Sequence, residues 1–239
     1  MRAATKKVRS GRGGSAPARA SIDEDAPSLA EKAYKAILRG LFNRTIPVGV
    51  DLSQSELIRL LGITSQPLRD ALRTLENEGL VTIHARSGIR FIRADLELSR
   101  STYQFRSLIE RAGARILAES ADAAETQALA DDHRALLARL EAGIWGEEEA
   151  LILDDLENRL HNALISALRN PLIELTARRL KNYVTLVRLD WLTTRPLAMR
   201  TLREHLEILD ACIARDADAA EAALINHFQL ALQRLIGMV

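Results

Sequence analysis

The chain has 239 residues, enough for one large domain or two small ones. Hydrophobic residues make up 47% and charged residues 27%, which is typical of a folded protein and excludes a largely disordered one. The single cysteine, Cys212, excludes an internal disulfide and a cysteine-based zinc finger. No apolar run reaches the ~20 residues that cross a bilayer, and the basic N-terminus lacks the apolar segment of a secretory signal. We therefore expect a cytoplasmic protein that does not interact with membranes.

The net charge of +1 conceals an asymmetry between the two halves of the chain. Residues 1–97 carry 16 Lys and Arg against 11 Asp and Glu, a net charge of +5. Residues 98–239 carry 17 against 21, a net charge of −4. A basic first half favours contact with a polyanion such as DNA, although a split of this size also arises by chance.

The first half of the chain predicts a basic tail followed by a small DNA-binding unit. Residues 1–27 are rich in Ala, Ser, Gly and Arg and show no periodicity, so we expect a flexible arm. Between residues 28 and 95, the apolar spacing predicts helices over 29–43, 53–61 and 65–78, then short strands over 80–83 and 89–93. Three helices followed by a β-hairpin wing form a winged helix-turn-helix.

The helix predicted over residues 65–78 has two unlike faces. Leu68, Leu72 and Leu75 share the apolar face. The residues expected to face DNA on this helix and the wing are Thr64, Ser65, Gln66, Arg69, Arg73, Arg86 and Gly88. Arginine pairs with guanine or phosphate, glutamine with adenine, and hydroxyl groups with phosphate. Each residue alone fits a solvated helix face, but the set predicts an interface for double-stranded DNA.

The second half predicts an all-α domain over residues 96–239. Helical periodicity marks segments near 98–120, 124–143, 147–168, 171–193, 197–214 and 217–236. Short loops between amphipathic helices predict an antiparallel bundle. Because the composition is rich in Leu and Ala, the whole chain is expected to be mainly α.

Three histidines of this half, His161, His205 and His227, fall on different predicted helices among apolar neighbours. Glu157 lies four residues before His161 and therefore shares its helix face. Three imidazoles and one carboxylate suit Zn²⁺, with Ni²⁺ or Mn²⁺ as alternatives. Residue types alone favour ordinary hydrogen-bonded histidines, so both interpretations stay open at this point.

Residues 55–81, including Gly62-Ile63-Thr64-Ser65-Gln66-Pro67-Leu68-Arg69, closely resemble the DNA-binding domain of the GntR family of bacterial transcriptional regulators. Members of that family usually carry an arginine that contacts DNA where this chain has Ser65. The resemblance therefore implies an altered operator preference or weaker binding. Residues 156–172, His205, His227 and the turn at 216–220 resemble the FCD effector domain of the FadR-type branch.

This resemblance implies a metal centre and an effector. Metal-binding FCD domains use one aspartate and three histidines, and Glu157 stands here at the position of the aspartate, beside His161, His205 and His227. Arg106 resembles an arginine that faces the ligand cavity in this family. An arginine beside a metal would favour a small carboxylate effector. The alternative for Arg106 is an ion pair with Glu110, one turn along the same helix.

The sequence thus predicts a ligand-responsive regulator, expected to be a repressor. A palindromic operator needs two reading heads about 34 Å apart, which predicts a homodimer. Two alternatives remain. One is a metal-dependent enzyme with an appended DNA-binding module, although the sequence offers no general acid or base beside the ligands and no Gly-x-Ser-x-Gly motif. The other is a regulator whose metal is purely structural.

Overall fold

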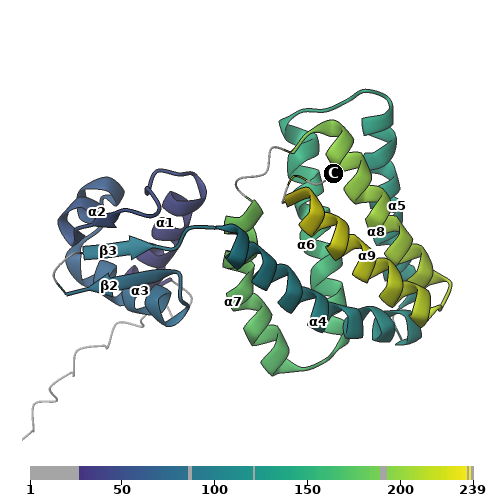
Figure 1. Ribbon diagram of the computed structural model, residues 1–239, viewed down its shortest axis with the longest axis horizontal. Coiled ribbons are helices and arrows are strands. Elements are labelled where there is room, and N and C mark those ends of the chain that lie inside the picture. Colours follow the sequence, from purple (N-terminus) through teal and green to yellow (C-terminus); the bar gives the residue numbers. More distant parts are fainter. Residues whose placement is uncertain (1–26, 86–87, 121, 189–192, 236, 238–239) are drawn as a thin grey trace, which may run out of the picture.

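The computed structural model describes residues 27–85, 88–120, 122–188, 193–235 and 237. Figure 1 shows a small N-terminal unit, which combines helices and a sheet, beside a larger helical unit. The predicted fold class, mainly α with an N-terminal winged helix-turn-helix and a C-terminal helical domain, is confirmed. In the described ranges, no helix is long and apolar enough to span a bilayer. Residues 1–26 of the predicted arm and Arg86 lie outside the described residues.

The N-terminal unit contains α1 (Leu29–Phe42), α2 (Gln54–Leu61) and α3 (Ser65–Asn77). A capping box at Ser53 and Glu56 starts α2, since each residue satisfies a backbone N–H of the other. Gly62, with a φ of +65°, ends α2 and turns the chain into α3. The apolar faces of these helices enclose a core that includes Ile37, Leu57 and Leu72.

A three-stranded antiparallel sheet closes this unit in the order β1-β3-β2. Its strands are β1 (Asp51–Leu52), β2 (Val81–His84) and β3 (Gly88–Phe91). The sequence predicted the β2–β3 hairpin but missed β1, because two residues are too few to show a periodic pattern. Gly88 has a φ of +109°, and a Cβ there would lie 2.7 Å from the carbonyl oxygen of Leu52. The absence of a side chain at Gly88 therefore allows β3 to approach β1.

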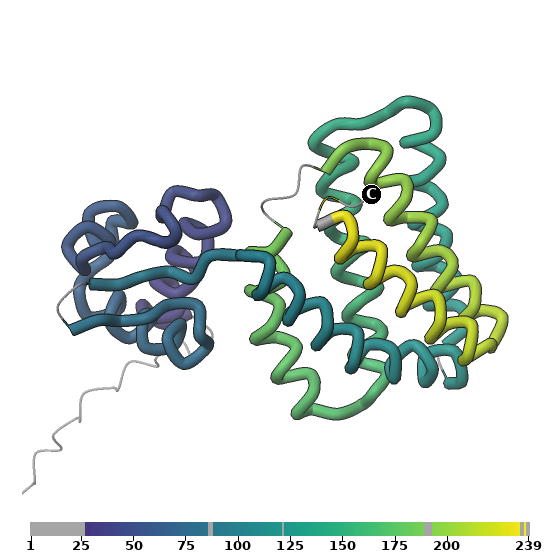
Figure 2. The backbone as a smooth tube through the Cα atoms, in the orientation of Figure 1, coloured from purple at the N-terminus to yellow at the C-terminus, as the bar shows by residue number. Residues whose placement is uncertain are grey.

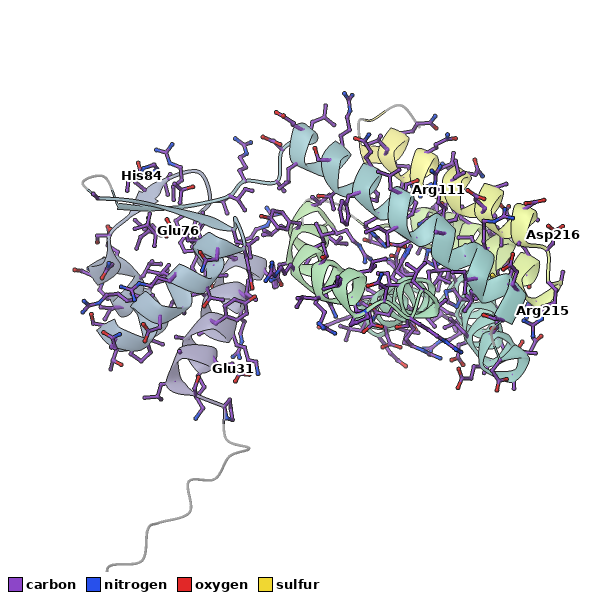
Figure 3. The ribbon with its side chains drawn as sticks, turned by 90° about the horizontal axis from the view of Figure 1, so that it is seen from below. Glu31, Glu76, His84, Arg111, Arg215 and Asp216 are labelled. Carbon is purple, nitrogen blue, oxygen red and sulfur yellow. The ribbon has the colours of Figure 1, made fainter. Side chains whose placement is uncertain are left out.

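The C-terminal unit is helical throughout. It contains α4 (Leu96–Ser120), α5 (Ala123–Glu141), α6 (Glu147–Ala167), α7 (Pro171–Arg188), α8 (Arg195–Ile213) and α9 (Ala217–Leu235). The tube in Figure 2 runs from β3 almost directly into α4. Asp216, labelled in Figure 3, starts α9 by accepting a hydrogen bond of 2.9 Å from the backbone N–H of Ala219.

Helix α7 differs from the other helices of this unit. It lies at the edge of the bundle, on the side of the N-terminal unit (Figure 1). Its two consecutive buried residues belong to different cores: Leu186 packs into the N-terminal core and Val187 into the bundle core. Consequently, α7 is packed against both units and cannot shift against one without disturbing the other.

Helices α4 and α6 approach each other closely at Gly113. A Cβ at this position would lie 1.9 Å from the carbonyl oxygen of Leu164. Gly113 follows Glu110 on α4 by three residues, and Leu164 follows His161 on α6 by three. The contact therefore sets the separation of the helices that carry these two polar side chains.

We predict that Gly113→Ala lowers the free energy of unfolding by about 3 kcal/mol, because the backbones of α4 and α6 must move apart to admit a methyl group. Urea denaturation measures the change. Gly146→Ala is the matched control, since a Cβ there lies no closer than 3.5 Å to the Glu149 carboxylate. Equal stabilities for the two variants would show that the close approach is dispensable.

Candidate functional site

Helix α3 presents a polar face opposite its buried leucines. Gln66, Arg69 and Arg73 are exposed there, whereas Leu68 and Leu72 are buried. The Arg69 guanidinium donates a hydrogen bond of 2.7 Å to Ser65 Oγ. Ser65 thus orients the neighbouring arginine.

The N-terminal end of α3 has polar groups available for a ligand. Thr64 precedes the helix as its N-cap, but its side chain makes no capping hydrogen bond. The amide nitrogen of Gln66 donates to both carboxylate oxygens of Asp70 at 3.1 Å. Thr64 and Gln66 are both exposed at the N-terminal end of the helix, the end that favours anions.

The bundle brings together three histidines from three helices. His161 of α6, His205 of α8 and His227 of α9 each offer one ring nitrogen, and these nitrogens lie within 4.8 Å of one another. All three side chains are buried. Because they are separated by 44 and 22 positions in the sequence, only the packing of the bundle places them in one cluster, which we call the histidine cluster.

Glu157, the fourth residue of the predicted set, borders this cluster. Its carboxylate oxygens lie 3.5 Å from His161 Nε2 and 3.8 Å from His205 Nε2. Within the described residues, the ligand atoms that all lie within 4.8 Å of one another belong to the three histidines, and the group does not include Glu157. Burial favours the neutral acid, but the positive charge of Arg188, 3.4 Å away, together with the neighbouring His161 and His205, holds the pKa of Glu157 well below its ordinary value.

Each histidine of the cluster is held through its Nδ1 atom. His161 Nδ1 contacts a carboxylate oxygen of Glu110, and His227 Nδ1 lies 2.9 Å from Glu204 Oε2. His205 Nδ1 lies 3.2 Å from Nε2 of a further histidine, His133. The opposite nitrogens, Nε2 of His161 and of His205, are buried and have no hydrogen-bond partner. An unpaired buried nitrogen is costly unless a partner such as a cation satisfies it.

The protonation of the cluster follows from burial. Desolvation lowers the pKa of His227 and, more strongly, that of His205. Neutral imidazole is the form that ligates a metal. Burial and the charge of Arg106 oppose protonation of His161, but the carboxylates of Glu110 and Glu157 together outweigh them and raise the pKa of this residue.

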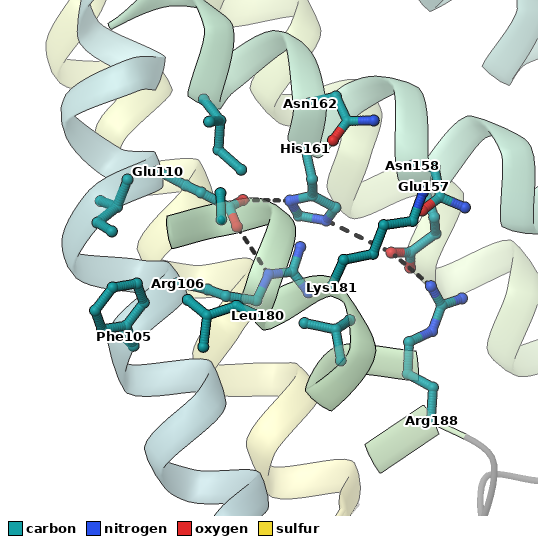
Figure 4. Close-up of a pocket in the computed structure, with 14 residues that line it drawn as sticks. Phe105, Arg106, Glu110, Glu157, Asn158, His161, Asn162, Leu180, Lys181 and Arg188 are labelled. Carbon is teal, nitrogen blue, oxygen red and sulfur yellow. Dashed lines mark hydrogen bonds and ion pairs between the residues drawn. The ribbon is translucent and has the colours of Figure 1, made fainter. Parts of the chain in front are cut away.

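Arg106 satisfies both interpretations of the sequence. Its Nε donates a hydrogen bond of 2.7 Å to Glu110 Oε1, so the ion pair along α4 exists and is buried. Arg106 also lines the cavity next to His161 (Figure 4). Its guanidinium lies 5.1 Å from the centre of the Phe228 ring, which supports it from the other side.

A cavity of about 470 Å³ opens beside the histidine cluster. His227 and Glu157 line it, together with four cationic side chains: Arg106, Lys181, Arg188 and Arg234. An adjoining smaller hollow, drawn in Figure 4, shares several of these residues and reaches His161. Arg106, Arg188 and Arg234 also form ion pairs with nearby carboxylates. The cationic side chains still outnumber the carboxylates that line the cavity, which favours an anion as its ligand.

Helix α7 connects this cavity with the N-terminal unit. Lys181, Val184 and Arg188 line the cavity. On the other side of the helix, the Tyr183 hydroxyl donates to the backbone carbonyl of Glu78, the C-cap residue of α3. A second path runs through hydrogen bonds from Asn182 to the Tyr34 hydroxyl, at 2.9 Å, and from this hydroxyl to Glu78 Oε2, at 2.8 Å. One helix thus contacts both the cavity and the end of the helix that presents Arg69.

Sequence reasoning did not predict that Glu110, His133 and Glu204 hold the histidines. The spacing of Glu110 indicated only an ion pair with Arg106, and Glu204 contacts His227, 23 positions away, so local spacing gave no signal for either contact. His133 lies on the apolar face of its helix with Leu129, Leu136 and Leu140. A polar side chain buried on such a face needs a hydrogen-bond partner. The partner itself is 72 positions away and is not visible in a periodic pattern.

A winged helix-turn-helix joined to a helical domain with a cationic cavity defines a two-domain DNA-binding regulator. Residues 29–91 match the family described as "Bacterial regulatory proteins, gntR family", and residues 101–230 match the "FCD domain" family. The chain belongs to the GntR family of transcriptional regulators and carries an FCD effector-binding domain. FCD domains often bind metals.

The chain matches related transcriptional regulators over most of their length. The chain is 28% identical to the HTH-type transcriptional repressor RspR of Escherichia coli K12, with 83% of the chain and 85% of that protein covered. It is 26% identical to the Nta operon transcriptional regulator of Aminobacter aminovorans, with coverage of 80% and 87%. The family and these relatives are transcriptional regulators, not enzymes, which removes the metal-dependent enzyme from consideration.

Solved structures share the fold. The crystal structure of a "putative transcriptional regulator GntR" from Rhodococcus sp. RHA1 matches with a TM-score of 0.66 at 20% identity, covering 88% of this chain and 98% of that one. E. coli McbR/YncC matches with a TM-score of 0.63 at 18% identity and the same coverage. These likenesses support the two-domain architecture.

Proposed function

We propose that the protein is a ligand-responsive repressor that binds a palindromic operator as a homodimer in the cytoplasm. A small organic acid, bound at or near a divalent metal ion in the FCD domain, changes its affinity for DNA. The observation that carries this proposal is the position of the histidine cluster: it borders a cationic cavity, and one wall of this cavity is the helix α7 that also holds the winged helix-turn-helix.

The donor set supports the metal. His161, His205 and His227 would hold the ion, with Glu157 as the oxygen ligand. Ligands of one tetrahedral zinc ion lie about 3.4 Å apart, so the present spacing needs only a small contraction. The unpaired Nε2 atoms of His161 and His205 fit this role. Three nitrogens and one oxygen favour zinc, with nickel or manganese as alternatives. The bound ion would supply a positive charge next to the cavity, which would attract an anion.

Charge and size of the cavity support a small organic acid. A carboxylate beside the ion would meet the Arg106 guanidinium, whose Nε alone is paired with Glu110. Lys181 and Arg188 on α7 extend the cationic lining away from the cluster. Arg234 already donates two hydrogen bonds, of 2.6 and 2.9 Å, to Glu204. It would therefore attract the acid through its charge and not through a direct hydrogen bond. An acid that reaches Lys181 and Arg188 would pull on α7 directly.

The contacts of α7 support a route from the cavity to DNA. Movement of Lys181 and Arg188 towards an anion shifts Tyr183 and Leu186 on the same helix. These residues contact the C-cap of α3 and the core beneath it, so the winged helix-turn-helix units would change orientation. Coupling of this kind is reciprocal, and operator DNA must alter the affinity for the acid by the same factor.

The DNA interface and the homodimer rest on α3 and on symmetry. Thr64, Ser65, Gln66, Arg69 and Arg73 are proposed to contact the operator, with Arg86 and Gly88 contributing from the wing. Two copies of α3 about 34 Å apart would read the two half-sites of a palindrome. The name of the related repressor RspR supports repression as the direction of control.

We predict that zinc raises the melting temperature of the metal-free protein, because the ion binds the folded state only; at 100 times its dissociation constant this adds about 2.7 kcal/mol. Thermal denaturation followed by circular dichroism measures the shift. His227→Ala is expected to lose most of it, whereas His84→Ala, which alters an exposed histidine of the wing, should keep it. An equal shift in both variants would place zinc elsewhere.

For the DNA interface, we predict that Arg69→Ala weakens operator binding by roughly 1–3 kcal/mol, the usual contribution of an arginine that reads a base. Fragments from the chain's own genome, including its upstream region, provide the operator, and fluorescence anisotropy at two salt concentrations gives the affinity. The control is Arg111→Ala, which removes the same charge from an exposed position on α4 (Figure 3). Unchanged affinity of Arg69→Ala would remove this residue from the interface.

The effector is tested by titrating zinc-loaded protein on its operator with mono-, di- and tricarboxylic acids. We expect one class of acid to change operator affinity at least 5-fold, the lower end of typical allosteric coupling. Tyr183→Phe should bind zinc and operator as the wild type does but respond less to the acid, because it lacks the hydroxyl bonded to Glu78. A purely structural metal predicts instead that chelation lowers the melting temperature while no acid alters operator affinity.

A further inference from the structure

His133 lies behind the histidine cluster and is outside the set of proposed ligands. It is fully buried on α5. Its Nδ1 lies 2.7 Å from the carbonyl oxygen of Leu129, one turn earlier on the same helix. Its Nε2 lies 3.2 Å from Nδ1 of His205. His133 therefore links a backbone carbonyl to one histidine of the cluster.

The carbonyl of Leu129 determines which ring nitrogen of His133 carries the proton. A carbonyl oxygen only accepts hydrogen bonds, so the proton of His133 is on Nδ1. Within the described part of the chain, no carboxylate oxygen forms an ion pair with His133, and a fully buried imidazole without such a partner is neutral. Its Nε2 consequently carries a lone pair and accepts a hydrogen bond.

The acceptor on His133 in turn selects the tautomer of His205. The proton of His205 must lie on Nδ1 to be donated to His133, which leaves the lone pair on Nε2. This Nε2 is the buried atom that has no hydrogen-bond partner, 3.8 Å from Glu157. We propose that His133 is a positioning residue that holds His205 in the tautomer whose Nε2 can bind a metal ion. This inference rests on the proposed metal centre.

His133 also sets the charge around the centre. Carboxylates hold the Nδ1 atoms of His161 and His227, through Glu110 and Glu204. A neutral imidazole holds the third. The surroundings of the ion thus carry one negative charge fewer than three carboxylates would supply, which favours an anion beside the metal.

The tautomer is a property of the metal-free protein and can be measured without any ligand. In protein labelled with ¹⁵N-histidine, long-range ¹H–¹⁵N correlation spectra distinguish Nδ1–H from Nε2–H imidazole, and His84→Gln serves to assign the signals of the exposed histidine. We expect His205 to be the Nδ1–H tautomer in the wild type. An Nε2–H tautomer for His205 in the metal-free wild type would overturn the inference.

Two substitutions test the consequence for metal binding, using zinc alone with a competing chelator. His133→Leu removes the acceptor and is expected to weaken zinc binding 10- to 100-fold, the usual effect of losing such a partner. His133→Gln places an amide oxygen near the same point and is expected to stay within a few-fold of the wild type. Circular dichroism checks that both variants fold, and the wild-type spectra above do not depend on either variant.

The outcomes separate this inference from the proposed function. Wild-type zinc affinity in folded His133→Leu would contradict the positioning role. Failure of the wild type to bind zinc, with His205 still in the Nδ1–H tautomer, would contradict the proposed metal centre and support the tautomer assignment. Weak zinc binding by His133→Leu together with rescue by His133→Gln supports both.

Discussion

Three buried imidazoles at the centre of the bundle are held in place through their Nδ1 atoms, and the polar contacts of the domain core depend on this constraint. Glu110, His133 and Glu204 take up the Nδ1 atoms of His161, His205 and His227. A buried polar atom needs a partner, and the inner Nε2 atoms of His161 and His205 have none among the described residues. Hydrogen bonds at the outer Nδ1 atoms stabilise polar side chains from five helices in an otherwise apolar core.

In the proposed mechanism, close packing transmits the state of this centre. Gly113 lets α4 and α6 approach, which brings Glu110 to His161 and fixes Arg106 beside the cavity. Helix α7, which forms one wall of the cavity, places Leu186 in one core and Val187 in the other. A densely packed interior moves in discrete steps and does not deform gradually, so a ligand that displaces α7 displaces the DNA-binding unit with it.

The sequence predicted much of this and missed what depends on distant contacts. Long amphipathic segments defined the helices, and the spacing around Arg69 defined the DNA-binding unit, because these features repeat locally. The three histidines of the cluster were named as candidate ligands, but the partners of their Nδ1 atoms were not predicted, since His133 and His205 are 72 positions apart and meet only in the folded bundle. The short strand β1 and the contact of Tyr183 with Glu78 also depend on tertiary packing and carry no periodic signal.

The most direct test of coupling between the cavity and DNA is hydrogen exchange of the full chain, measured free and bound to its operator. We expect DNA to alter exchange in α7, over residues 171–188, and in the cavity-lining turns of α4 and α6, although none of these segments is proposed to touch DNA. A change confined to α2, α3 and the wing would contradict this coupling, because the reading heads would then act independently of the cavity.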